Sequence, residues 1–192
     1  MTRLSTLLSQ GAVSLLLLLI VLTTGCQGMA KDATTGIDGR VVNADKSIHI
    51  LWARMNGSGV SGSGGDECCM SIPAKWRPGM TAEITWKKDP SPGINPDGSR
   101  KPNAPGSFVT PEWSKWMDAH EKNYRVMKKT IFISKYDDIC KVNFVFLPCD
   151  DPRVIIDCDA QNKLFQNMPG GQNYDPELIR RLGGQTICQK PA

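Results

Sequence analysis

The stretch MTAEITWK, residues 80–87, decides the fold class expected for this chain. Apolar residues at the even positions, from Met80 to Trp86, alternate with polar residues at the odd positions. Successive side chains of a strand point to opposite faces, so this pattern predicts a strand with one face buried and one face in solvent. Such half-buried strands are typical of antiparallel sheets.

Neighbouring segments extend this strand into a sheet. Patterns or compositions typical of strands occur at residues 36–42, 47–55, 130–134, 141–147 and 154–158. An amphipathic helix is predicted over residues 111–127, because Thr110 can cap it and Pro111 suits its first position. A short helix is predicted over residues 176–182, closed by Gly183. We therefore expect an α+β fold with a mainly antiparallel sheet, one amphipathic helix and one short C-terminal helix, stapled by disulfides.

Two loops stand out between these elements. Residues 88–107 contain five prolines and three glycines without apolar periodicity, and loops of that length are usually either functional or disordered. Residues 56–69 read NGSGVSGSGGDECC, which contains the G-x-G-x-x-G pattern of dinucleotide-binding proteins. Pro73 and Pro78 follow closely, leaving no room for the long helix that would receive a phosphate. We expect no cofactor there, and a flexible connection instead.

The N-terminus has the features of an export signal. Arg3 precedes an apolar run at residues 12–22, shorter than the about 18 residues of a membrane span. Thr24-Gly25-Cys26 ends this run and resembles a bacterial lipobox, in which the cysteine carries the acyl chains, palmitate among them. We predict a lipoprotein signal peptide at 1–25, a tether at 26–35, and one globular domain at 36–192, held at the outer membrane and facing the periplasm. The alternative is a secreted protein cleaved elsewhere, with Cys26 a free thiol.

Six cysteines remain after Cys26, an even number that favours disulfides in an oxidising compartment. Their pairing is open, although adjacent Cys68 and Cys69 are expected to bond to distant partners and not to each other. No pair has the C-x-x-C spacing of a zinc site, so no metal is expected. The six are Cys68, Cys69, Cys140, Cys149, Cys158 and Cys188.

Catalytic patterns are weak. His49 and His120 are the only histidines, and His120 shares a helical stripe with Trp116 and Tyr124, which favours a structural role. No G-x-S-x-G motif is present, and the paired acids of the chain fit turns and solvated strand ends. The net charge of +4 comes from scattered residues, which argues against nucleic acid. We expect a protein that is not an enzyme.

Binding to a protein partner is then the expected activity. Trp113 and Trp116 are either core residues, the favoured interpretation, or interface anchors. The candidate surfaces are the proline-rich loop, the glycine-rich loop and the exposed edge of the helix. Candidate contact residues are Lys115, Asp118, Lys122 and Arg125 on the exposed edge of this helix, with Asp97 and Arg100 in the loop.

Several motifs together resemble a known family. Gly36-Ile37-Asp38-Gly39, Cys68-Cys69 and the series Pro73-x-x-Trp76-x-Pro78-Gly79 are similar to the bacterial lipoproteins of domain-of-unknown-function family 3304. The resemblance implies an immunity lipoprotein that binds and inhibits a phospholipase effector of the type VI secretion system, tethered to the membrane by its acyl chains. The alternatives are a structural or accessory envelope lipoprotein without a toxin partner, and a cryptic hydrolase that uses His49 or His120.

Overall fold

The computed structural model describes residues 33–103 and 109–188. The predicted signal peptide, Cys26 and most of the predicted tether therefore lie outside the described residues. The elements are β1 (Thr34–Asn43), β2 (His49–Met55), β3 (Ser58–Ser61), β4 (Glu67–Pro73), β5 (Thr81–Asp89), α2 (Pro111–His120), the 3₁₀ turn η1 (Glu121–Asn123), β6 (Arg125–Phe132), β7 (Ile139–Leu147), β8 (Asp151–Asp157), α3 (Cys158–Phe165), the 3₁₀ turn η2 (Gly171–Asn173) and α4 (Tyr174–Arg181).

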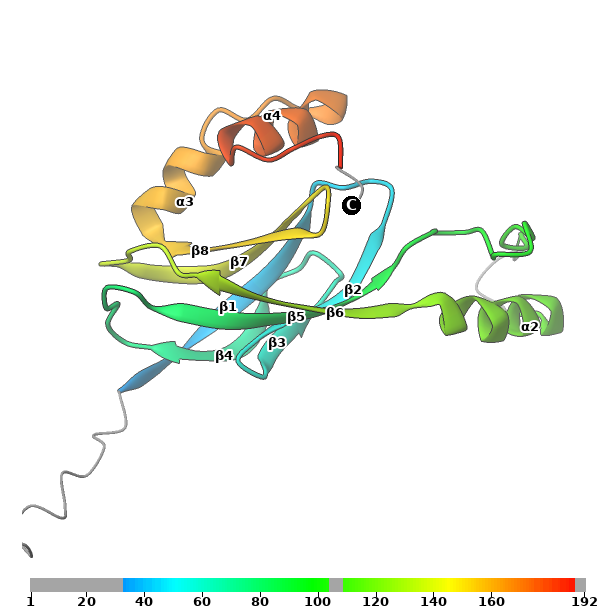
Figure 1. Cartoon of the computed structure of the whole chain (residues 1–192), viewed down its shortest axis with the longest axis horizontal. Coiled ribbons are helices and arrows are strands. Elements are labelled where there is room, and N and C mark those ends of the chain that lie inside the picture. The colour runs from blue at the N-terminus through cyan, green and yellow to red at the C-terminus, as the bar shows by residue number, and fades with distance from the viewer. Residues whose placement is uncertain (1–32, 104–108, 189–192) are drawn as a thin grey trace, which may run out of the picture. The chain divides into compact units, whose positions relative to one another are not determined.

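The strands form two four-stranded sheets, with the orders β4-β1-β7-β8 and β3-β2-β5-β6 (Figure 1). Neighbouring strands run antiparallel except for β1 and β7, which are parallel. The prediction of an α+β domain built mainly from antiparallel strands is confirmed. The structure adds that the described strands divide into two sheets and that α3 is a further helix.

Side chains from both sheets fill the main core between them. In β5 the even positions Ala82, Ile84 and Trp86 are buried at 3% exposure or less, as the alternating pattern predicts. The Trp86 ring lies 5.5 Å from the ring of Phe146 in the opposite sheet. Burial of each such side chain is worth about 1.5–3 kcal/mol, so this layer of contacts holds the two sheets together.

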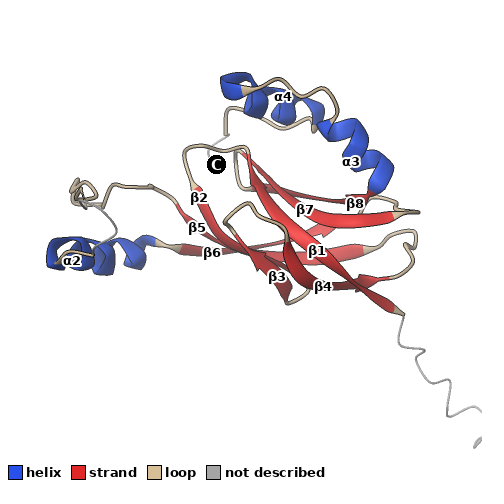
Figure 2. Ribbon diagram, turned by 180° about the vertical axis from the view of Figure 1, so that it is seen from behind, coloured by secondary structure: helices blue, strands red, loops and turns tan. Residues whose placement is uncertain are grey.

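A second core lies on the outer face of the β4-β1-β7-β8 sheet, where α3 and α4 cover it (Figure 2). Val145 and Leu147 of β7 meet Leu178 and Ile179 of α4 there. Because β7 has apolar neighbours on both faces, residues 142–147 are all buried. Arg181 joins the two helices by donating from Nη1 to the carbonyl of Gln166 (2.7 Å), just after α3.

The two largest differences from the predicted bounds concern α2 and β6. The predicted helix 111–127 ends at His120, and strand β6 begins at Arg125, earlier than the predicted strand at 130–134. From Arg125 onward the chain pairs with β5, and Met127 and Ile131 pack against the main core. The helical spacing of aromatic residues extends to Tyr124, but pairing with β5 prevails beyond it.

The glycine-rich stretch is also more ordered than predicted, because strands β3 and β4 lie within and after it. Gly62 approaches the backbone carbonyl of Ile50 so closely that a Cβ atom there would overlap it. Glu67 accepts hydrogen bonds from the backbone N–H of Ser61 (2.8 Å) and from Ser63 Oγ (3.1 Å). A hydrogen bond from the Ser61 hydroxyl, together with these two, lowers the pKa of Glu67, and the three bonds close the turn between the strands. A strand, and not a helix, follows the glycines, so the phosphate-binding setting is missing.

The described cysteines form three pairs, namely Cys68–Cys69, Cys140–Cys158 and Cys149–Cys188. The expectation that Cys68 and Cys69 bond to distant partners is wrong. The four other cysteines pair among themselves near β7, β8 and the C-terminus, which leaves Cys68 and Cys69 to each other on the exposed face of β4. The Cys149–Cys188 bond ties the C-terminal segment to the turn after β7.

Candidate functional site

A helix and a loop project together beyond the end of the sheets (Figure 1). We call residues 90–103 and 109–124 the helix–loop projection. Thr110 caps α2 as predicted, because its hydroxyl accepts a hydrogen bond from the Trp113 N–H at 3.1 Å. In the loop, the Asn95 N–H donates to the Ser99 carbonyl at 2.9 Å and the Gly98 N–H to the Asn95 carbonyl at 2.9 Å, which closes a tight turn. The projection therefore brings together two of the three predicted surfaces, the proline-rich loop and the edge of the helix.

His120 is the centre of a buried polar cluster at the base of this projection. Its side chain is 2% exposed, and its Nε2 lies 2.8 Å from Oδ2 of Asp89, at the end of β5. The other ring nitrogen, Nδ1, lies 2.8 Å from Oδ1 of Asn95 in the loop. The Asn95 amide nitrogen faces the Trp116 carbonyl at 3.4 Å, which fixes the orientation of that amide. One histidine thus connects a strand, a loop and a helix.

Aromatic rings pack around His120. The ring of Trp116 stacks on it with centroids 4.3 Å apart, and the ring of Tyr124 meets it edge-on at 5.6 Å. Trp116 Nε1 also donates to the Ser99 carbonyl of the loop at 3.3 Å. Burial raises the pKa of Tyr124, and the nearby charges of Asp89 and Glu121 raise it further. Trp116 is buried as the favoured interpretation expects, but against the loop and outside the main core cluster, while Trp113 is half-buried.

The second connection at the base of the projection is an ion pair. Lys88, 8% exposed, contacts the Asp150 carboxylate in the turn between β7 and β8. Cys149, the neighbour of Asp150, is bonded to Cys188. Buried lysines need a partner of opposite charge. The last two residues of β5 are thus both held by charged or polar partners, which fixes the direction in which the loop leaves the sheet.

The predicted contact residues all lie exposed on or beside the projection, but they do not form one cluster. Lys122 and Arg125 line a hollow together with Pro96, Ser91 and Tyr124. The other four, Lys115, Asp118, Asp97 and Arg100, are exposed but do not line this hollow. Hydrogen bonds from Ser99 lower the pKa of Asp97, so this carboxylate serves the turn.

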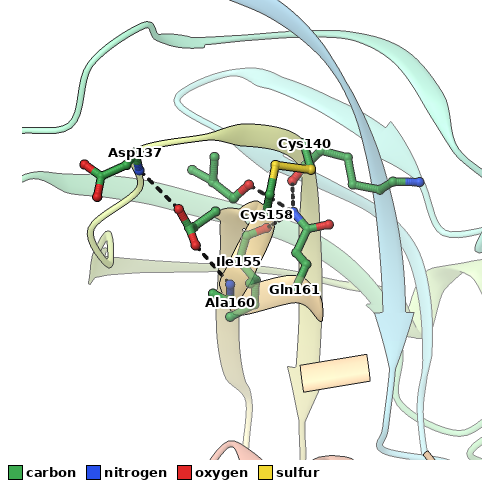
Figure 3. Close-up of a disulfide and its surroundings, with 9 residues drawn as sticks. Asp137, Cys140, Ile155, Cys158, Ala160 and Gln161 are labelled. Carbon is green, nitrogen blue, oxygen red and sulfur yellow. Dashed lines mark hydrogen bonds between the residues drawn. A yellow bond between two sulfur atoms is a disulfide. The ribbon is translucent and has the colours of Figure 1, made fainter. Parts of the chain in front are cut away.

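The remaining sequence candidates have structural roles. Asp157 caps α3 by accepting from the Ala160 N–H at 2.9 Å, and it also accepts from the Asp137 N–H at 3.1 Å (Figure 3). These bonds lower the pKa of Asp157. Gln161 donates to the Ile156 carbonyl at 3.0 Å beside the Cys140–Cys158 disulfide (Figure 3). Asp151 pairs with Lys129 and Arg153, and His49 is exposed at the start of β2.

Asp89, Asn95 and Ser99 are the residues of this site that sequence reasoning missed. All three lie in residues 88–107, which have no apolar periodicity. The sequence Asn-Pro-Asp-Gly at residues 95–98 predicts a turn, but it does not predict which helix or strand that turn contacts. Within residues 33–103 and 109–188, no cluster of three or more metal-ligating side chains occurs. The described helices are all too short or too polar to cross a membrane.

Comparison with known proteins gives one match. A family model described as "Protein of unknown function (DUF3304)" matches residues 41–154. This range extends from β1 to β8 and includes the whole helix–loop projection together with Lys88 and Asp150. No curated protein and no solved structure matches the chain. Because the matched range covers more than half of the sequence, the chain belongs to the family DUF3304.

Proposed function

We propose that this chain is an immunity lipoprotein that binds and inhibits a phospholipase effector of the type VI secretion system. Membership of DUF3304 and the lipobox-like sequence ending at Cys26 support the proposal. The observation that carries it is the helix–loop projection, whose exposed charged side chains stand on a base fixed by His120. A binding element that is already ordered loses less conformational entropy when its partner binds.

In this proposal the chain acts by binding and not by catalysis. Both ring nitrogens of His120 already face oxygen atoms, so neither is positioned to take a proton from a substrate. The described cysteines are paired as disulfides, which removes them as thiolate nucleophiles. An inhibitor of an enzyme needs a stable complementary surface and no reactive group of its own.

The proposed location is the periplasmic side of the outer membrane, with acyl chains on Cys26 as the anchor. The three disulfide pairs of the described residues fit an oxidising compartment. Acyl chains contribute about 0.8 kcal/mol per buried methylene, so two or more chains hold a small domain firmly at the membrane. The chain would then be positioned where an incoming phospholipase acts.

The test uses the acylated protein and the phospholipase encoded beside its gene. The two proteins should co-elute in gel filtration, and the complex should lose phospholipid hydrolysis. The variant Lys122→Glu/Arg125→Glu reverses both charges at the hollow and should weaken inhibition, whereas Lys75→Glu/Lys163→Glu, which reverses two exposed lysines elsewhere, should not. Absence of both complex and inhibition would overturn the proposal and leave the accessory envelope role.

A further inference from the structure

Strand β6 forms one edge of the β3-β2-β5-β6 sheet in the described structure. A hydrogen bond just beyond the strand shows which residues of β6 bond to β5: the Ile133 N–H donates to the Met80 carbonyl at 2.9 Å. Hydrogen-bonded pairs alternate along an antiparallel ladder. The odd-numbered residues of β6, such as Met127, Lys129 and Ile131, therefore bond to β5.

The even-numbered residues have the opposite orientation. The backbone N–H and C=O groups of Val126, Lys128, Thr130 and Phe132 point away from β5, toward the open side of the sheet. The pairing of β5 with β2 is consistent with this orientation. The Asn56 N–H donates to the Glu83 carbonyl at 2.9 Å, so the odd-numbered residues of β5 bond to β2 and its even-numbered residues bond to β6. Within the described residues, these four alternate positions of β6 thus present backbone groups that pair with no other strand.

The other sheet edges are interrupted or face each other. The Ala44 N–H donates to the Phe146 carbonyl at 2.9 Å, so the even-numbered residues of β7 face β1 and its odd-numbered residues bond to β8. Pro152 lies opposite Phe146 and therefore faces outward from β8, where it has no N–H to offer. Edges β3 and β4 face each other, since Ser58 Oγ accepts from the Ser71 N–H at 3.3 Å. Of the described edges, β6 is the one that presents regular donors and acceptors.

A groove runs beside this edge. It is lined by residues 129–132 of β6 and residues 151–155 of β8, with Leu182 at its wall. Phe132 is 80% exposed and Val126 is 61% exposed, so apolar side chains mark both ends of the strand. An added strand would bury these two side chains as well as satisfy the backbone groups.

The positive charge of β6 indicates which kind of strand would pair with this edge. The strand carries Arg125, Lys128 and Lys129 and no acidic residue. Pairing of two copies of β6 would bring like charges together, which is destabilising. Glu83 contacts Lys128 at 2.6 Å and Asp151 contacts Lys129 at 3.3 Å, but the side chains of Lys128 (63% exposed) and Lys129 (46% exposed) remain accessible beside the exposed Arg125. An acidic strand fits this edge better than a second copy of the chain.

We propose that β6 accepts an extended acidic segment of the effector as an additional antiparallel or parallel strand. This inference rests on the proposed function for the identity of the partner, and it adds a way of docking that the helix–loop projection alone does not provide. Arg125 belongs to both surfaces, so a partner could contact the hollow and the edge of the sheet together.

Amide hydrogen exchange provides the direct test. In the free protein the amides of Lys128, Thr130 and Phe132 should exchange quickly, while those of Met127, Lys129 and Ile131 are protected by β5. Addition of the effector should slow the three even-numbered amides at least about tenfold, as new ladder bonds form. If the complex forms and the even-numbered amides keep their rates, strand addition at β6 is wrong while the proposed function stands.

Substitutions separate backbone from side-chain contributions. Thr130→Pro removes an outward N–H and should weaken the complex at least about tenfold, whereas Thr130→Ala keeps that N–H and should bind normally. Lys128→Gln/Lys129→Gln should weaken binding, and Lys75→Gln/Lys163→Gln should not. Circular dichroism of each variant establishes that it is folded before binding is measured. Equal binding by Thr130→Pro and Thr130→Ala, with both folded, would contradict the inference.

A synthetic probe tests the edge without the effector. An acetylated peptide of about eight residues with alternating Val and Glu has the length and charge expected of the added strand. It should protect the same even-numbered amides in low salt, and a Val-Lys peptide should not. If the effector does not bind, the proposed function fails, and the Val-Glu peptide still decides the inference: protection supports it, and lack of protection overturns it.

Discussion

Replacement of His120 by alanine tests whether the polar cluster fixes the helix–loop projection. The change removes the contacts to Asp89 and Asn95, both 5% exposed and both 2.8 Å from the ring nitrogens. A buried polar group left without its hydrogen-bond partner costs about 1–3 kcal/mol, so leaving both Asp89 and Asn95 unpaired costs about 2–6 kcal/mol. His120 and Trp116 lie outside the main core cluster, so most of this cost should appear as easier opening of the projection and not as global unfolding.

The assay is amide hydrogen exchange of α2 in both proteins. A cost of about 3 kcal/mol corresponds to an exchange rate about 100-fold higher for α2 amides, since each 1.4 kcal/mol is a factor of ten. Amides in β7 should change far less. His49→Ala is the matched control, because His49 is exposed at the start of β2, and exposed substitutions change stability by about 0.5 kcal/mol or less. If α2 exchanges at the same rate in His120→Ala and His49→Ala, the cluster does not hold the projection.

Three further predictions concern stability. Hydrogen bonds from Arg180 and Arg181 lower the pKa of Glu177 from 4.5 to about 2, so its contribution is complete above pH 4.5 and is lost as the pH falls toward 2; the difference in urea midpoint between the wild type and Glu177→Gln should therefore be smaller at pH 3 than at pH 7. Cys140→Ser/Cys158→Ser opens a loop with a sequence separation of 18 and should cost about 3 kcal/mol, whereas Cys149→Ser/Cys188→Ser, with a separation of 39, should cost about 4 kcal/mol in the same urea titration; the reverse order would contradict the loop-entropy argument. Gly62→Ala places a methyl group against the Ile50 backbone and should lower the free energy of unfolding by about 1–3 kcal/mol, while Gly65→Ala, where Ser63 Oγ at 4.0 Å is the nearest atom, should be nearly neutral in thermal unfolding.

Sequence reasoning predicted the elements with strong local patterns. The alternation around Ile84 gave β5, and the Thr110-Pro111 pair gave the start of α2, because both depend on residues close together in the chain. The end of α2 was placed too late, since the aromatic spacing continues to Tyr124 while β6 already pairs with β5 from Arg125. The sequence does not predict α3, and the predicted strand at 154–158 includes Cys158, which is the first residue of that helix.

The candidate site was predicted in its outer parts and missed at its centre. Lys122 and Arg125 are predicted on the polar face of a helix, and both are exposed, although Lys122 lies in η1 and Arg125 begins β6. His120 was expected to be structural, which its burial supports, but its partners lie 25 and 31 residues away in the sequence. No local pattern relates a histidine on a helix to an asparagine in a proline-rich loop.

By itself the sequence determined that β5 is a strand with one apolar face, that α2 begins at Pro111, and that the described domain would combine mainly antiparallel strands with disulfides. Those features depend on periodicity and composition over a few neighbouring residues. Tertiary structure decided which cysteines pair, that His120 joins Asp89 to Asn95, and that β6 leaves its even-numbered backbone groups open. Each of these depends on segments far apart in the chain, whose meeting is set by packing of the whole domain and by the cost of closing the intervening loops.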